Sequence, residues 1–483
     1  MSPLYAGVIG AILVILLAVS LSRLRGTKTK QDYLVAGRSL PAFVLVFTLL
    51  SSWIGSGSLL GGAENAYNHG LVALWQPAGG WAGLLLIYFI APRARKFAQY
   101  TIPDLLEARY NQGARVLGVI ATLFAYTAIT SYQLIGGGDI LNLIFPHTIT
   151  PVLGEFILAF LVIFFTALAG MSSVAYMDLF IGLLATVTLI VAFPVLLHQV
   201  GGWSGFHAAL PARQFTVFGD YSHIAALGLF LPTCLLMLGN QAMYQKFFSA
   251  RSERDARRSV VGWIIGTVIL ETVIVLIAML GHVRSLAAHP APKPREIIAF
   301  TGLHSLPTLL GALLMGAVFA KVISTANNYL FSPATNLVQD VYVRYIDRNA
   351  SNKRILIVSR LVVVFLGVWS LYQALGTASV LKATLYAYTI YSATLTPVVL
   401  AAFYSKRVNG AGAVSAIAAG TIITVFWDKD APFVHAHLPM MLAQRDAIFP
   451  ALGAALLCLF GVSYATKPPT AKQLSLHNSP VEE

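Results

Sequence analysis

The sequence predicts an all-α polytopic membrane protein. Of its 483 residues, 57% are hydrophobic and only 11% are charged, whereas soluble domains carry about 25% charged residues. Nearly uncharged stretches of about 18 residues or more, long enough for a helix to cross a bilayer, recur along the chain. The short alternating segments of a membrane β-barrel are not evident in the sequence. The net charge of +13 does not indicate nucleic-acid binding, because the basic residues lie mainly in short loops between apolar stretches.

The apolar stretches predict thirteen transmembrane helices. The first stretch has no basic start and no convincing cleavage site, so it is interpreted as a retained helix and not as a signal peptide. The expected spans are 4–22, 40–63, 71–92, 115–143, 150–170, 174–198, 223–242, 260–282, 308–336, 356–375, 380–404, 410–427 and 447–466.

The distribution of Lys and Arg predicts the orientation of these spans. About 24 of these residues, Lys246 among them, fall in one set of loops and about 7 in the other. We therefore expect an N-terminus outside and a C-terminus in the cytoplasm, in a plasma membrane such as the bacterial inner membrane. Residues 1–466 would form one transmembrane domain, and the polar tail 467–483 is expected to be disordered.

The second span contains a run of small residues that weakens a helix. Gly55-Ser56-Gly57-Ser58 is followed by Gly61 and Gly62. In transporters, broken helices of this kind expose backbone carbonyls at a binding site near the middle of the bilayer. The alternative is close packing of two helices through small residues.

The ninth span carries a polar face in the middle of an apolar segment. Its members are Lys321, Ser324, Thr325, Asn327 and Asn328. Because such groups are costly in hydrocarbon, they should face a cavity, an ion or each other. The segment therefore indicates handling of an ion or a solute.

Several motifs, spread over nearly the whole chain, together carry a resemblance to a known family. They are residues 32–40 (DYLVAGRSL), 51–57 (SSWIGSG), 101–110 (TIPDLLEARY), 245–251 (QKFFSAR), 324–326 (STA) and 340–342 (DVY), with Pro397, Lys406, Arg407, Gly410 and Gly412. In this order and spacing they resemble the sodium:solute symporters, which include bacterial proline, sialic acid and galactose transporters and the mammalian sodium–glucose carriers.

The resemblance implies a leucine-transporter-type fold. Residues 1–39 would contain a leading helix, and residues 40–198 and 223–404 would form two inverted repeats of five helices each. Residues 410–466 would supply two trailing helices.

The resemblance also implies a sodium site between the second and ninth spans. Its ligands would be the backbone carbonyls of Ser51, Ile54 and Lys321 and the hydroxyls of Ser324 and Thr325. Taken alone, the two hydroxyls would more readily bond to carbonyls of their own helix, and the motifs around them reverse that preference. A hard cation takes oxygen ligands of this kind.

Lys321 departs from the family, where a small residue is typical. Its ammonium could replace the coupling ion, so that transport would be sodium-independent or proton-coupled. It could instead reach a water-filled vestibule while only its carbonyl binds sodium, or it could contact an anionic solute.

Two acidic residues lie within predicted spans. Asp178, in a segment that resembles the family's Trp-Thr-Asp, could serve the ion path or pair with Lys321. Glu271 is interpreted as an interfacial contact without a role.

The solute should bind beside the broken second span. Trp53 and Tyr386 could form an aromatic wall or gate, although polar residues also join helices in membranes. The polar candidates are Ser56, Ser58, Gln76, Gln133, Asn240, Gln241 and Tyr388.

These features favour a cation-coupled symporter, with sodium as the expected ion, that imports a small polar organic solute by alternating access. The alternative is a sodium-independent or proton-coupled carrier in which Lys321 replaces the ion. No HExxH, GxSxG or Cys/His cluster indicates an enzyme, and no cofactor beyond the coupling ion is expected. The short tail argues against a sensor with a signalling domain. A monomer in the lipid bilayer is expected.

Overall fold

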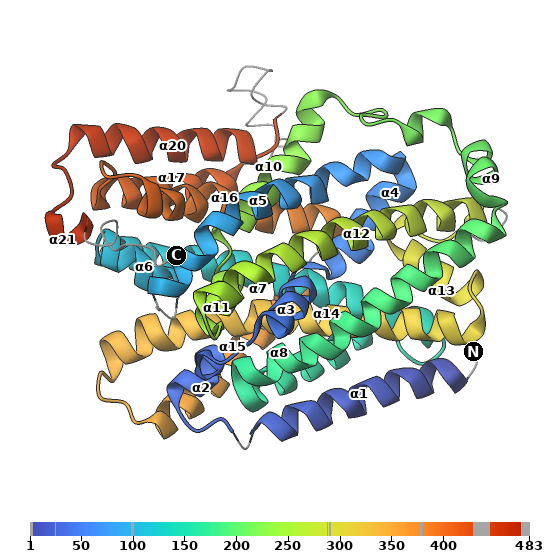
Figure 1. Ribbon diagram of the computed structural model, residues 1–483, viewed down its shortest axis with the longest axis horizontal. Helices are drawn as coiled ribbons and strands as arrows, with labels where there is room; N and C mark the ends of the chain where they lie inside the picture. The colour runs from blue at the N-terminus through green and yellow to red at the C-terminus, as the bar shows by residue number, and fades with distance from the viewer. Residues whose placement is uncertain are drawn as a thin grey trace.

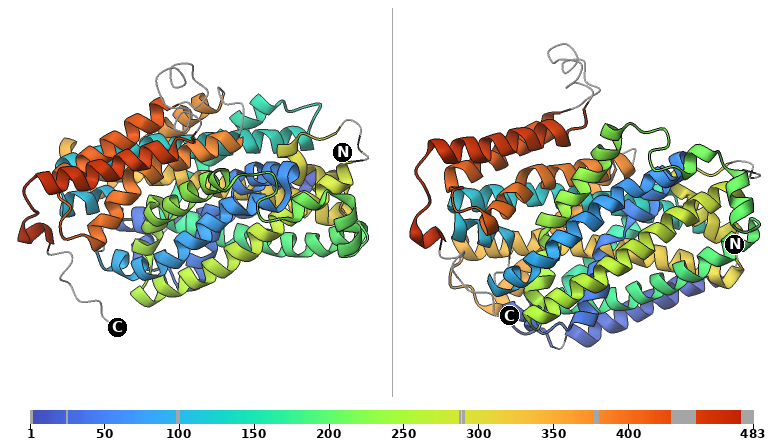
Figure 2. Two further views of the ribbon diagram at one scale, coloured as in Figure 1. Left: turned by 90° about the horizontal axis from the view of Figure 1, so that it is seen from above. Right: turned by 45° about the horizontal axis from the view of Figure 1, so that its top comes forward.

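The computed structural model describes residues 3–24, 26–97, 101–286, 288, 291–375, 380–427 and 445–474. These residues form helices joined by short connections. Leu40 and Ala250 form an isolated parallel β-bridge, and the described residues contain no β-strand. Long helices lie side by side, with α1 along one edge of the bundle and α17 and α20 along the opposite edge (Figures 1 and 2). The prediction of an all-α membrane protein is confirmed.

The helices follow one another along the chain with few long connections. The first half comprises α1 (Pro3–Leu24), α2 (Lys30–Val35), η1 (Ala36–Arg38), α3 (Ala42–Trp53), η2 (Gly57–Gly62), α4 (Ala63–His69), η3 (Gly70–Leu74), α5 (Trp75–Phe97), α6 (Ile102–Arg109), α7 (Gln112–Ile144), α8 (Pro151–Gln199) and α9 (Gly202–Ala209). The second half comprises η4 (Ala212–Phe215), α10 (His223–Gly239), α11 (Gln241–Ser249), α12 (Glu253–Ser285), η5 (Pro294–Glu296), α13 (Ile297–His304), α14 (Thr308–Asn336), η6 (Leu337–Ile346), α15 (Asn352–Ala374), α16 (Val380–Tyr404), α17 (Gly410–Phe426), α20 (Ile448–Ala465) and α21 (Ala471–Leu474).

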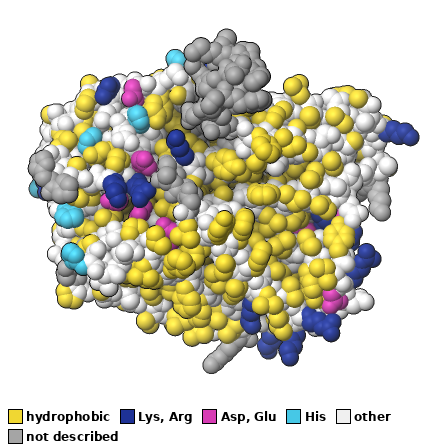
Figure 3. Space-filling view, turned by 180° about the vertical axis from the view of Figure 1, so that it is seen from behind, with side chains coloured by type: hydrophobic (Ala, Val, Ile, Leu, Met, Phe, Trp, Pro, Cys, Tyr) yellow, Lys and Arg dark blue, Asp and Glu magenta, His cyan; other side chains and the backbone are white. Residues whose placement is uncertain are grey.

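Eleven helical stretches of the described residues are long and apolar enough to cross a membrane. Two further apolar helices, α3 and α17, are shorter, with 12 and 17 residues, so the count of thirteen spans stays a prediction. The surface between the two ends of the bundle is mostly hydrophobic, and Lys and Arg gather toward the ends (Figure 3). This distribution suits a bundle whose sides face lipid.

The second predicted span is broken at the place where its small residues lie. Helix α3 ends at Trp53, and Ile54 is extended, with φ −83° and ψ 100°. A side chain at Gly55 would collide with Thr325 and Gln133, so glycine permits the close approach of α3 to α14 and α7. The break therefore exposes backbone groups beside α14, as the sequence indicated.

Two other breaks shape the bundle. Gly170 adopts φ +67° within α8 and joins the fifth and sixth predicted spans without a loop. Helix α10 ends at Gly239, and Asn240 is extended before α11 begins, with its side chain accepting a hydrogen bond from the backbone of Met243. Helix α11 thus continues beyond the break and packs inside the bundle against α3, α5 and α14.

Segments 32–40 and 245–251, which both contribute to the family resemblance, lie against each other. The backbones of Leu40, Ser249 and Arg251 exchange two hydrogen bonds, of 3.1 and 2.9 Å. The Gln245 amide donates to the carbonyl of Leu34 at 2.9 Å. These contacts fix the end of the bundle at which α2 and α11 lie. Within the predicted tail, α21 is helical and Gln473 donates to the carbonyl of Tyr110; residues 475–483 lie outside the described residues.

Candidate ion and solute sites

Five oxygen-bearing groups converge where α14 crosses the break after α3, and we refer to them as the cation cage. They are the carbonyls of Ser51, Ile54 and Lys321 and the hydroxyls of Ser324 and Thr325. The Thr325 hydroxyl lies 2.9 Å from the Ser51 carbonyl, 3.3 Å from that of Ile54 and 3.0 Å from that of Lys321. The Ser324 hydroxyl lies 3.5 Å from the Ser51 carbonyl. The sequence-predicted ligands are therefore brought together.

Asp178 on α8 lies beside the cation cage, and its carboxylate is almost entirely buried. Ser324 donates to one carboxylate oxygen at 2.5 Å, and Thr48 and Asn328 donate to the other at 2.5 and 3.0 Å. Asp178 thus belongs to the same network as the cage hydroxyls. Of the remaining polar residues of α14, Asn327 faces Thr166 instead.

The ion-pair partner of Asp178 is Lys246, not Lys321. The Lys246 ammonium lies 3.9 Å from the Asp178 carboxylate and donates to the carbonyl of Thr48 at 2.8 Å. Both side chains are at most 1% exposed. The expectation of a Lys321–Asp178 pair is therefore not met among the ion pairs of the described residues, and the assignment of Lys246 to a basic loop is wrong.

The signal that could have located Lys246 is the composition around it. Tyr244, Phe247 and Phe248 flank it and are all buried, whereas a basic loop is polar. A charged residue within an aromatic segment indicates a buried ion pair better than a loop.

The Lys321 ammonium lies inside the protein beside the cage. It donates to the Ser51 hydroxyl at 3.2 Å, and the residue is 1% exposed. The side chain therefore does not extend into an open vestibule in this structure. Two buried ammoniums, of Lys246 and Lys321, accompany one carboxylate here.

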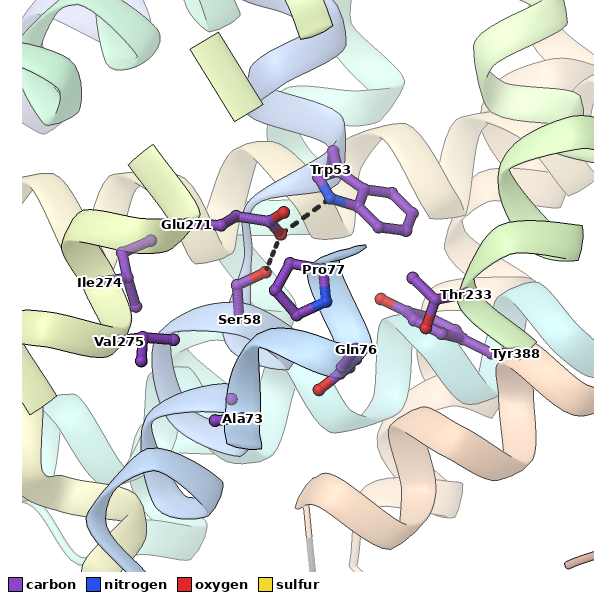
Figure 4. A pocket seen from close by; sticks show the side chains of 11 residues that line it. Trp53, Ser58, Ala73, Gln76, Pro77, Thr233, Glu271, Ile274, Val275 and Tyr388 are labelled. Atoms are coloured by element: carbon purple, nitrogen blue, oxygen red, sulfur yellow. Dashed lines mark hydrogen bonds between the residues drawn. The ribbon is translucent and has the colours of Figure 1, made fainter. Parts of the chain in front are cut away.

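A second site lies on the other side of the break, in a cavity between α3, η2, α5, α10, α12 and α16. The volume of the cavity is about 20 Å³, which is room for about one water. Its polar lining comprises Trp53, Ser58, Gln76, Thr233, Glu271 and Tyr388 (Figure 4). Four of these were predicted as solute contacts from the sequence, and Thr233 and Glu271 were not.

Glu271 is the acidic group of this cavity. One carboxylate oxygen accepts from the Trp53 indole at 2.9 Å and from the Ser58 hydroxyl at 3.1 Å (Figure 4). The other accepts from the Trp81 indole at 3.1 Å. The interpretation of Glu271 as an interfacial contact is wrong, because the residue is buried at mid-helix in α12. A glutamate within an otherwise apolar stretch was the sequence signal that could have indicated a buried functional group here.

The other predicted solute contacts hold helices together or lie elsewhere. Gln133 accepts from the backbone of Ser56 at 2.7 Å, and Asn240 joins Tyr126 to Tyr329. Gln241 accepts from the backbone of Ile102. None of these, nor Ser56 itself, lines the cavity.

Tyr386 is the clearest correction. It is 42% exposed and lines a surface groove with Phe124, Tyr372 and Lys382. On α16, the side chain two residues later, Tyr388, faces the cavity instead and stacks on Trp53 with ring centroids 6.0 Å apart.

Charged networks close the bundle at both ends. At one end, Arg115 pairs with Asp104, Glu107 and Asp340. At the other, Arg295 pairs with Asp139 at 3.1 Å. The cavity and the cage lie between these two networks.

The profile described as the sodium:solute symporter family matches residues 33–420. The chain belongs to the sodium:solute symporter family. It is a cation-coupled secondary transporter and not an enzyme.

A relative of similar length agrees with this membership, and solved structures share the fold. A sodium/proline symporter of Staphylococcus aureus is 24% identical over 481 residues, which cover 95% of this symporter and 92% of the relative. A Na⁺-coupled sialic acid symporter in a substrate-bound outward-open state has a similar fold, with a TM-score of 0.79, 18% identity and coverage of 96% and 98% of the two chains. A nucleobase-cation-symport-1 family transporter in a closed conformation gives a TM-score of 0.61 at 12% identity, with coverage of 94% and 98%.

Proposed function

We propose that this symporter imports a small polar organic solute together with sodium, by alternating access. Sodium would bind in the cation cage, and the solute in the cavity around Trp53 and Glu271. The observation that carries the proposal is the convergence of the Thr325 hydroxyl on three backbone carbonyls, at 2.9 to 3.3 Å. An all-oxygen donor set of this kind suits a hard cation, and the end of a broken helix supplies its carbonyls.

A second candidate is a carrier in which Lys321 takes the place of sodium. Its ammonium donates to the Ser51 hydroxyl, so a fixed positive charge already lies beside the cage. Two unit charges about 4 Å apart repel by about 4 kcal/mol at an effective dielectric constant of 20. Sodium would therefore bind with Lys321 neutral or displaced, or would not bind at all, in which case transport would be sodium-independent or proton-coupled.

The test is solute uptake into proteoliposomes with and without a sodium gradient, at fixed pH. Wild-type uptake that requires sodium supports the first candidate, and full uptake without sodium supports the second. Lys321→Ala removes the competing charge, so it should lower the sodium concentration for half-maximal uptake under the first candidate and should make uptake depend on sodium under the second. Lys353→Ala, at an exposed position in the first turn of α15, is the matched control and should behave as wild type.

Orientation, domain division and assembly form part of the proposal. We expect a monomer of one transmembrane domain, residues 1–466, with the N-terminus outside and the C-terminus in the cytoplasm. Residues 40–198 and 223–404 would be the inverted repeats. The excess of basic loops on one side supports this orientation. Labelling single cysteines placed at each terminus with an impermeant reagent, in intact cells, tests it.

A further inference from the structure

We propose that the solute carries a protonated nitrogen, which binds between the carboxylate of Glu271 and the amide oxygen of Gln76. This inference rests on the proposed solute uptake through the same cavity. It assigns a binding role to Glu271 and a charge class to the solute.

The charge of Glu271 is not balanced by the protein. Its three hydrogen-bond donors, the indoles of Trp53 and Trp81 and the hydroxyl of Ser58, are all neutral. Among the described residues, Glu271 takes part in no ion pair, and the cavity lining contains no Lys, Arg or His. An isolated buried carboxylate is costly without a counter-charge. A cationic solute would supply that charge at the moment of binding.

The hydrogen-bonding capacity of the cavity points the same way. A carboxylate offers about four acceptor positions, and the oxygen bonded to Trp81 receives one hydrogen bond. The amide oxygen of Gln76 is buried in the cavity lining and has no partner. The carboxylate oxygen of Glu271 that is bonded to Trp81 and the amide oxygen of Gln76 can therefore each accept a further hydrogen bond. An ammonium group suits them because it donates hydrogen bonds and accepts none.

The aromatic lining suits a cation as well. The rings of Trp53 and Tyr388 stack at 6.0 Å with an interplanar angle of 26°, and both line the cavity. The faces of such rings attract cations within about 6 Å of the centroid. An anionic solute would meet the like charge of Glu271 instead.

The cavity as it stands has room for about one water, so the solute must enter when the bundle opens. The first experiment therefore measures binding in a protein free to change conformation. Purified symporter in lipid nanodiscs is titrated with ethanolamine, putrescine, proline, galactose and lactate. Each titration is done in about 100 mM NaCl and, separately, in about 100 mM KCl, so that the ionic strength is the same. Binding is read from thermal stabilisation and confirmed by calorimetry.

At least one of the three amines, ethanolamine, putrescine or proline, should bind. Glu271→Gln keeps the shape of the side chain and removes its charge, and should weaken amine binding by about 10- to 100-fold. Glu253→Gln, at the first turn of the same helix α12 and outside the cavity, is the matched control and should change nothing. Gln76→Leu leaves the three donors of Glu271 in place and should weaken binding by about fivefold. It keeps the test open if Glu271→Gln fails to fold.

Three results would overturn the inference. The first is that galactose or lactate binds while no amine does. The second is that none of the three amines binds. The third is that an amine binds but neither Glu271→Gln nor Gln76→Leu weakens its binding. Amine binding that is equal in sodium and potassium leaves this inference standing and contradicts the sodium-coupling proposal, so the two can fail separately.

Discussion

Removing the charge of Asp178 should destabilise the protein by leaving Lys246 buried without its partner. The two groups are 3.9 Å apart and at most 1% exposed, and Lys321 adds a second ammonium nearby. Breaking a buried pair by removing one partner costs about 3–5 kcal/mol. Asp178→Asn should therefore lower the Tm of the purified protein, in a fixed detergent and without solute, by several degrees.

The double variant Asp178→Asn/Lys246→Met separates the pair energy from other effects. It removes both charges, so it should recover at least half of the stability lost in Asp178→Asn, because contacting residues are coupled by about 0.5–3 kcal/mol. Lys353→Met, at an exposed position, serves as the control for removing a lysine. Equal stability of Asp178→Asn and wild type, or strictly additive losses in the double variant, would show that the two charges do not depend on each other.

Three further predictions concern single groups. Thr325→Val keeps the shape of the side chain but removes the hydroxyl from the cage, so the sodium concentration for half-maximal uptake should rise about tenfold; an unchanged value would remove Thr325 from the ion site. Arg115→Met leaves the buried carboxylate of Asp340 without its guanidinium, at a cost of about 3–5 kcal/mol, and should lower Tm, with Asp340→Asn added to restore it. Burial raises the pKa of Asp32, but hydrogen bonds from Thr29 and the charge of Lys28 outweigh this and hold the pKa below its usual value. The stabilisation of α2 by Asp32 is therefore present at neutral pH and lost as the pH falls below about 4, so the Tm difference between wild type and Asp32→Asn should shrink there.

The sequence predicted the helical membrane class, and its small residues indicated where the second span could break. Small residues at 55–58 weaken a regular helix, and the adjacent hydroxyls of Ser324 and Thr325, within a polar face of an apolar segment, indicated an ion or a cavity beside them. Both properties are local, and both are read from a few neighbouring residues.

Lys246 and Glu271 could not be placed in the same way. Counting basic residues assigns every lysine near a span end to a loop, but Lys246 lies on α11, which continues inside the bundle after the break at Asn240 and is buried along its length. The partners of Glu271 come from α3, η2 and α5, which are distant in sequence. Tyr386 and Tyr388 differ by two positions on one helix, and only the packing of α16 decides which faces the cavity.

The cage and the cavity share one short piece of backbone, and this can couple ion to solute. The carbonyls of Ser51 and Ile54 face Thr325, while Trp53 and Ser58, on either side of the same break, hold Glu271. A cation that fixes the carbonyls also fixes the position from which Trp53 reaches the cavity. Solute and sodium should therefore raise each other's affinity by one common factor, about 5- to 150-fold for typical couplings. Calorimetric titration of the amine at several sodium concentrations, and of sodium at several amine concentrations, measures the factor twice, and linkage requires the two values to agree; a factor of one would mean that the break does not link the sites.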